Sequence, residues 1–177
     1  MATRLPDFRY HPDPLATGSI VPSDSSCECC GRARGYLYKA PIFCKDEVQD
    51  ICPWCIASGE AATKFDAHFS DDHPLIEAGI SASVINEVTR RTPGVFSWQQ
   101  ERWQAHCNDA CEFHGDASLP ELQNLSGVAL TNLLQSRNLD RKYWRQVLRH
   151  YEPGGSPSVY KYVCRHCNEA IYTMDFA

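Results

Sequence analysis

Four closely spaced cysteine pairs are the residues of this chain whose type and spacing could do chemistry. They are Cys27 and Cys30, Cys52 and Cys55, Cys107 and Cys111, and Cys164 and Cys167. Two thiolates a few residues apart can bind one tetrahedral cation from a tight turn, and two such pairs supply all four ligands of a structural zinc ion. The spacing therefore predicts two structural zinc ions that stabilise the fold, with no residue assigned a catalytic role.

The first two pairs predict a zinc unit over residues 26–65. Gly31 follows the first pair and permits the turn of a zinc knuckle, while apolar residues within 35–44 favour a β-hairpin. Pro53 lies between the second pair and suits the first turn of a helix, where its missing N–H costs nothing. The order knuckle, hairpin and helix predicts a treble-clef-like unit.

The second set leaves one ligand open. Its first pair has three intervening residues instead of two, and His106 and His114 lie beside it, so that either histidine could replace Cys111. If one position were instead left to water, the zinc could be catalytic, with Asp109 or Glu112 as acid or base. A metal-dependent hydrolase is therefore kept as an alternative.

Other reactive side chains are interpreted as structural. Cys29 could exchange with its neighbours as a ligand, and Cys44 is expected to be a buried thiol. Residues 68–73 contain two histidines and two aspartates, which we interpret as a polar loop rather than a metal site.

Charge is unevenly distributed and constrains the partner. Residues 46–121 contain 14 acidic and four basic side chains, a net charge of −10, within a chain of net charge −5. This segment disfavours nucleic acid and suits a basic protein, such as a toxin that the chain would neutralise in the manner of an immunity protein. A nucleic-acid-binding role, the weakest alternative, would use basic residues on both sides of the acidic segment. These are Arg32, Arg34, Arg141, Arg145 and Arg149.

The remaining pattern predicts an α+β chain of 177 residues forming one domain. Residues 1–25 suit a docked extended arm, and residues 66–105 a helical segment that includes a helix at 97–105. Residues 106–177 suit a second zinc unit, in which the helical insertion 112–157 precedes a hairpin around Cys164 and Cys167. The second zinc ion would fasten this insertion at its base.

No apolar run of 18 residues and no secretory signal are legible, so we expect a cytoplasmic protein with reduced thiols and no membrane span. Secretion with five disulfides is the rival interpretation. The oligomeric state is not predicted.

Longer motifs resemble the CbrC family of bacterial proteins. They include the opening from Leu5 to Gly18, Cys52-Pro-Trp-Cys-Ile-Ala57, Arg91-Thr-Pro-Gly94, residues 98–103, residues 106–109 and the final cysteine pair. The resemblance covers nearly the whole chain. It implies a bacterial cytosolic protein linked to stress and to colicin tolerance, without an established enzymatic activity. We therefore expect a non-enzymatic zinc protein that acts through a protein partner, either a basic toxin or a stress-response protein.

Overall fold

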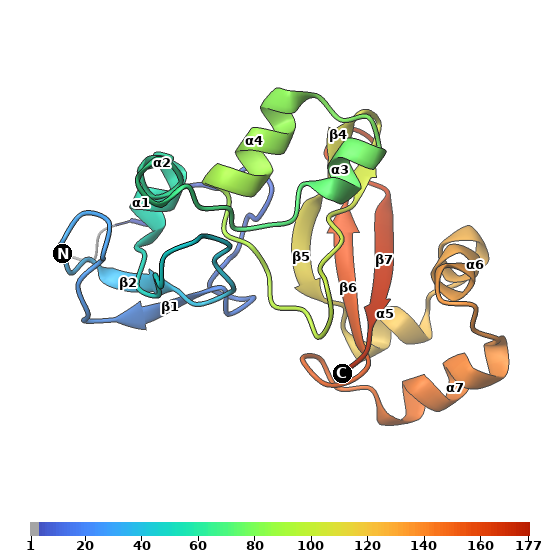
Figure 1. Cartoon of the computed structure of the whole chain (residues 1–177). Coiled ribbons are helices and arrows are strands. Elements are labelled where there is room, and N and C mark those ends of the chain that lie inside the picture. Colours follow the sequence, from blue (N-terminus) through green and yellow to red (C-terminus); the bar gives the residue numbers. More distant parts are fainter. Residues whose placement is uncertain (1–3) are drawn as a thin grey trace.

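A computed structural model describes residues 4–177 and shows a mixed α+β fold, which confirms the predicted fold class (Figure 1). The N-terminal half contains β1 (Ile20–Ser23), β2 (Gly35–Tyr38), α1 (Pro53–Ala57), α2 (Glu60–Phe65), α3 (His73–Glu77) and α4 (Ala82–Arg91). The C-terminal half contains β3 (Ala105–His106), β4 (Asp109–Ala110), β5 (Glu112–Asp116), α5 (Leu119–Gln123), α6 (Gly127–Ser136), α7 (Arg141–His150), β6 (Ser158–Val163) and β7 (Ala170–Asp175). None of the helices in residues 4–177 is both long and apolar enough to cross a membrane.

The N-terminal unit is built on the antiparallel pair β1–β2, in which Ile20 lies opposite Tyr38. The hairpin predicted within residues 35–44 is wrong, because the partner of β2 precedes the first cysteine pair in the chain. After β2, Phe43 instead exchanges backbone hydrogen bonds of 2.8 and 2.9 Å with His68. A helix does begin at Pro53, directly after Cys52, but the treble-clef arrangement is not confirmed.

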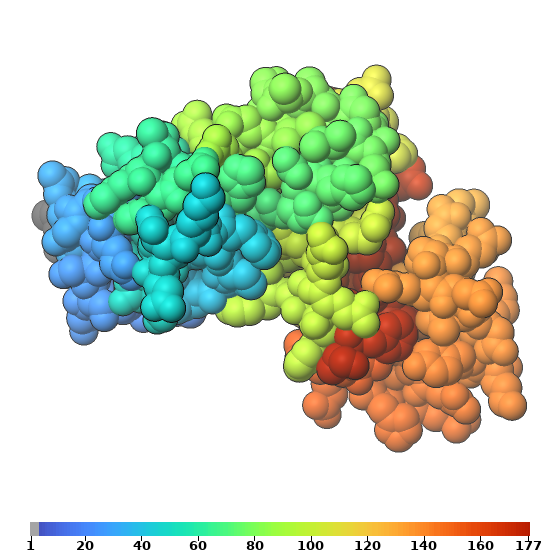
Figure 2. Space-filling model, in the orientation of Figure 1, coloured from blue at the N-terminus to red at the C-terminus, as the bar shows by residue number. Residues whose placement is uncertain are grey.

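The C-terminal half contains the antiparallel sheet β5–β6–β7. Strands β6 and β7 form the hairpin predicted around the last cysteine pair, with register from Ser158 opposite Asp175 to Val163 opposite Ala170. The helices α5, α6 and α7 lie between β5 and β6 in the chain. They pack beside the sheet at one end of the molecule, visible as the orange lobe in Figure 2.

The arm that begins at Arg4 docks against both halves of the molecule. Tyr10 is fully buried, and its carbonyl oxygen accepts a 2.8 Å hydrogen bond from the N–H of Phe113 in β5. His11 is also fully buried, with Nδ1 2.8 Å from the carbonyl oxygen of Pro93. Residues 1–3 of the predicted arm lie outside the described residues.

The helix predicted at residues 97–105 is wrong. The segment is an irregular loop up to β3, and partners far away in the chain take its polar groups. The N–H groups of Trp98 and Gln99 both donate to the Asp175 carboxylate, at 2.6 and 3.1 Å. The indole of Trp103 is buried and donates to the carbonyl oxygen of Cys111 at 2.9 Å. These tertiary bonds outweigh the modest local preference for a helix.

Candidate metal centres

The first cluster brings together the four cysteines predicted for the N-terminal zinc unit. The thiols of Cys27, Cys30, Cys52 and Cys55 all lie within 4.8 Å of one another. The Sγ atoms of Cys27 and Cys55 are 3.9 Å apart, and those of Cys52 and Cys55 are 3.5 Å apart. A tetrahedral zinc ion with Zn–S bonds of about 2.3 Å requires sulfur atoms about 3.8 Å apart. The donor set therefore fits a zinc ion.

Local backbone geometry positions these thiols. The N–H of Gly31 donates to the carbonyl oxygen of Cys27 at 2.7 Å, and Gly31 has a φ of +69°, which favours glycine. On the other side, Cys52 is the N-cap of α1 and Pro53 occupies the first turn. The N–H of Cys52 donates to the Cys27 sulfur at 3.2 Å. N–H groups aimed at sulfur favour the thiolate that a metal ion requires.

Crowding of the thiols opposes their ionisation, and a bound cation would reverse this effect. Burial and neighbouring thiols raise the pKa of Cys52 to about 11, and the same causes raise that of Cys55 further. The pKa of Cys30 is lowered, because hydrogen bonds from its neighbours outweigh its desolvation. Without a cation, the four sulfur atoms could not all be ionised at neutral pH. A bound zinc ion would stabilise all four thiolates and link their ionisation to folding.

The second cluster contains a histidine where the sequence analysis placed Cys111. The side chains of His106, Cys107, Cys164 and Cys167 offer four ligand atoms within 4.8 Å of one another. Nδ1 of His106 lies 3.3 Å from the Cys107 sulfur and 3.4 Å from the Cys167 sulfur. Cysteine and histidine together are common ligands of structural zinc. This donor set also fits a zinc ion.

Cys111 does not lie in this cluster, and neither does His114. Cys111 directly precedes β5, and its side chain is completely buried in the apolar core. The Nε2 atom of His114 lies 3.2 Å from the Glu112 carboxylate on the same strand. The sequence offered one signal for the histidine: the unusual three-residue spacing, with His106 directly before Cys107. The side to which each residue points depends on the β3–β4 turn, which the spacing does not reveal.

Two tight turns present the second cluster. Cys107 and Asn108 connect β3 to β4 with φ values of +50° and +58°, and the other two cysteines lie in the β6–β7 turn. Burial opposes ionisation of Cys164, but backbone N–H groups of Cys167 and His166 outweigh it and lower its pKa to about 6. The turn thus favours a thiolate at neutral pH. Cys107 and Cys167 are exposed, which leaves this cluster more open to solvent than the first.

The Glu169 carboxylate lies on the side of the His106 ring that points away from the cluster sulfur atoms. His106 Nε2 lies 3.6 Å from the Glu169 carboxylate, while Nδ1 faces the sulfur atoms. A histidine that binds a metal through one ring nitrogen commonly donates its other N–H to a carboxylate, which fixes the ring and its tautomer. Glu169 lies slightly beyond hydrogen-bond distance of His106, in the direction from which a carboxylate supports a metal-bound histidine.

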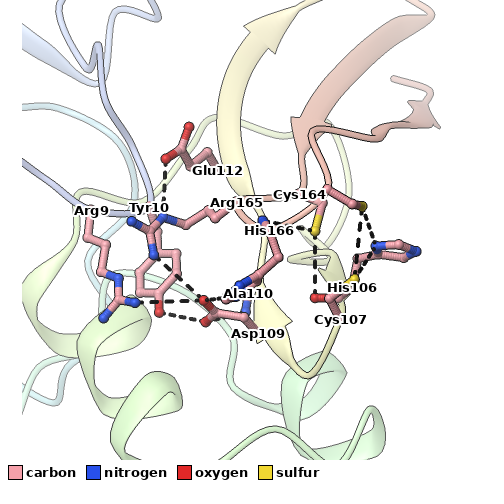
Figure 3. Close-up of polar contacts among 11 residues, drawn as sticks. Arg9, Tyr10, His106, Cys107, Asp109, Ala110, Glu112, Cys164, Arg165 and His166 are labelled. Atoms are coloured by element: carbon pink, nitrogen blue, oxygen red, sulfur yellow. Dashed lines mark hydrogen bonds and ion pairs between the residues drawn. The ribbon is translucent and has the colours of Figure 1, made fainter.

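Asp109 anchors the arm beside the second cluster, as Figure 3 shows. Its carboxylate is almost fully buried and accepts a 2.7 Å hydrogen bond from the Tyr10 hydroxyl. His166 Nε2 lies 3.0 Å from the same carboxylate, and the Arg165 guanidinium 3.6 Å. Although burial opposes it, the contacts with Tyr10 and His166, the Ala110 N–H and the nearby Arg9 lower the pKa of Asp109. Because His166 lies between two cluster cysteines, the arm and the metal centre share one network.

The two carboxylates considered as catalytic acid or base are both engaged elsewhere. Asp109 is held by the arm network, and Glu112 lies 3.2 Å from Arg165 and 3.2 Å from His114. Residues 68–73 form no metal cluster within residues 4–177, and His73 instead lies 3.2 Å from Glu77.

The two remaining cysteines, Cys29 and Cys44, and the arginines of α7 lie outside the two four-ligand clusters. Cys44 donates to the Asp46 carbonyl oxygen at 3.0 Å. Cys29 lies near Cys55 and Glu60 and forms with them a third group of possible ligands. Three of the arginines considered for nucleic-acid binding lie along α7 with exposed side chains: Arg141, Arg145 and Arg149.

Comparison with known proteins places the chain in a family. The sequence profile described as "Uncharacterised protein family (UPF0167)" matches residues 5–176. UPF0167 protein PA1536 of Pseudomonas aeruginosa is 47% identical over 174 residues, which cover 97% of each chain. UPF0167 protein Mb2317 of Mycobacterium bovis is 37% identical over 177 residues, which cover 98% of this chain and 95% of the relative. No solved structure matches the chain. These relatives are named for UPF0167, and the CbrC designation stays a prediction from the sequence motifs.

Proposed function

The chain belongs to the uncharacterised protein family UPF0167, and we propose that it is a non-enzymatic protein, held together by two structural zinc ions, that acts by binding another protein. The ligands of the first zinc ion would be Cys27, Cys30, Cys52 and Cys55. Those of the second would be His106, Cys107, Cys164 and Cys167. The first ion would hold a treble-clef-like turn, and the second would fasten the helical insertion.

One observation carries the proposal: each cluster offers four protein donors to one ion. A zinc ion with four protein ligands has no position left for water or substrate, and such sites are structural in known proteins. Each cluster also joins segments that are distant in the chain, since 21 residues lie between Cys30 and Cys52 and 56 lie between Cys107 and Cys164. Holding such segments together is what a structural ion does.

The kind of partner follows from charge and resemblance. The acidic segment 46–121 suits a basic protein, because complementary charge speeds association and selects partners. The resemblance to the CbrC family suggests tolerance to a bacteriocin as the setting, and a basic toxin as one candidate. The cytoplasm would keep the ligand thiols reduced.

A genetic experiment tests the proposal. Bacteria that lack the gene would be challenged with purified bacteriocins and complemented with wild-type protein, with Cys52→Ser or with Cys44→Ser. We expect deletion to raise sensitivity. Wild-type protein and Cys44→Ser should restore tolerance, whereas Cys52→Ser should not, because only Cys52 belongs to a zinc cluster. Unchanged sensitivity, or full rescue by Cys52→Ser, would contradict the proposal.

A further inference from the structure

A cavity of about 500 Å³ lies away from both metal centres. Three segments line it: residues 41–43 after β2, residues 68–72 before α3, and residues 95–101 in the loop before β3. Figure 2 shows the face on which residues 95–101, in yellow-green, lie between the N-terminal unit and the C-terminal strand. None of the eight residues of the two clusters lines this cavity.

The lining has the mixed character of a small-molecule site. Val95 and Pro41 provide apolar walls, and Phe43 is an aromatic side chain that is 50% exposed. Binding pockets for small molecules typically have volumes of about 300–1,000 Å³ and combine apolar walls with a few polar groups. The volume and the lining both fall within this description.

Acidic side chains dominate the polar part of the lining. Asp71, Asp72 and Glu101 all line the cavity, and Glu101 is only 7% exposed. Within residues 4–177, none of these three carboxylates forms an ion pair with a lysine or arginine. Glu101 accepts a 2.8 Å hydrogen bond from the N–H of Asp71, which compensates only part of its desolvation.

A buried hydroxyl beside these carboxylates also lacks a partner. Ser70 lines the cavity and is 1% exposed; its Oγ lies close to the Glu101 carboxylate but forms no hydrogen bond of normal geometry within residues 4–177. Such groups are rare in folded proteins, because an unpaired buried hydroxyl costs free energy. A ligand that hydrogen-bonds to it would remove this cost.

We propose that this cavity binds a small aliphatic amine, whose ammonium groups meet the three carboxylates while its carbon chain lies against Phe43 and Val95. A divalent metal ion fits less well, because the potential ligand atoms here do not converge as they do in the two cysteine clusters. The cavity thus gives the chain a ligand site that is independent of zinc.

The experiment is a titration of the zinc-loaded, isotope-labelled full chain, followed by two-dimensional NMR. The probes are 1,4-diaminobutane, the neutral 1,4-butanediol and Mg²⁺. We expect saturable shifts at residues 68–72 and 95–101 with the diamine alone. Glu101→Gln should weaken binding about tenfold or more, which corresponds to about 1.4 kcal/mol. The exposed Glu152→Gln, which makes the same charge change outside the cavity, should bind as the wild type does.

Ser70→Ala provides a second test that does not endanger folding, since the hydroxyl that it removes forms no hydrogen bond of normal geometry within residues 4–177. It should retain stability and weaken diamine binding several-fold. An absence of saturable shifts would overturn the proposal. So would equal shifts with butanediol or Mg²⁺, or binding that neither Glu101→Gln nor Ser70→Ala weakens.

Discussion

The buried side chains of His11 and Glu101 should make the stability depend on pH in opposite directions. Replacing either one should therefore reveal a pH dependence that nearly cancels in the wild-type protein. Burial lowers the pKa of His11 from 6.5 to about 4, and a carbonyl oxygen and a hydroxyl hold its neutral ring at 2.8 and 2.7 Å. Burial raises the pKa of Glu101 from 4.5 to about 7. The two shifts are similar in size and opposite in their effect on proton binding.

The signs follow from linkage between proton binding and folding. Between pH 4 and 6.5 the unfolded chain binds a proton at His11 that the folded chain does not, so the contribution of His11 is complete above pH 6.5 and is lost as pH falls. Between pH 4.5 and 7 the folded chain binds the extra proton at Glu101, so that contribution is complete below pH 4.5 and is lost as pH rises. Each changes by about 1.4 kcal/mol per pH unit, or about 3 kcal/mol across its window.

In the wild type the two slopes should nearly cancel between pH 4.5 and 6.5. The assay is urea unfolding of wild type, Glu101→Gln and His11→Gln in zinc-containing buffer at pH 5.5, 6.0 and 6.5. The free energy of unfolding of Glu101→Gln, relative to wild type, should rise by about 1 kcal/mol over this range. That of His11→Gln should fall by a similar amount. Subtraction of the wild type removes the common effect of zinc–thiolate chemistry. If neither variant's free energy of unfolding, relative to wild type, varies with pH, the two pKa shifts are wrong.

Four further substitutions test the packing and the ligand assignment. His106→Ala should lower the zinc content from two ions to one per chain, as measured by elemental mass spectrometry. Cys111→Ala should retain both ions and lower the free energy of unfolding by about 1 kcal/mol. The reverse pattern of zinc loss would show that Cys111, and not His106, is the ligand. Gly94→Ala should prevent normal folding, because a Cβ there would overlap the Phe69 carbonyl oxygen, and a native-like thermal transition would contradict this. Tyr10→Phe should lower the free energy of unfolding by about 1–2 kcal/mol through loss of its 2.7 Å bond to a buried carboxylate, and an unchanged urea midpoint would show that this bond does not anchor the arm.

The sequence predicted the clustering of cysteine thiols better than the secondary structure around them. Cysteine spacing is a local property, so the first cluster and the last turn could be read directly from the chain. The pairing of β2 with β1 could not be predicted in this way, because it depends on which apolar segment folds back against β2. The supposed helix at residues 97–105 has a helix-compatible pattern, yet its N–H groups bind Asp175, which follows about 76 residues later.

The choice between His106 and Cys111 was equally non-local. Cys111 faces the apolar core of the sheet, while His106 faces the β6–β7 turn. Only the pairing of β3 with β4 decides this, and two-residue strands leave little periodicity in a sequence. The cavity beside Glu101 was hidden for the same reason, because its three walls come from separate parts of the chain.

The most direct test of the two proposed structural zinc centres is zinc K-edge X-ray absorption spectroscopy on reduced, tag-free protein whose zinc content is known. We expect two zinc ions per chain that together have seven sulfur ligands, one nitrogen ligand and no oxygen ligand, because the clusters contain seven cysteines and one histidine. Zn–S distances should be about 2.3 Å. Fewer than two bound ions, or an oxygen ligand that signals water at the second centre, would contradict the claim that both sites are closed and structural.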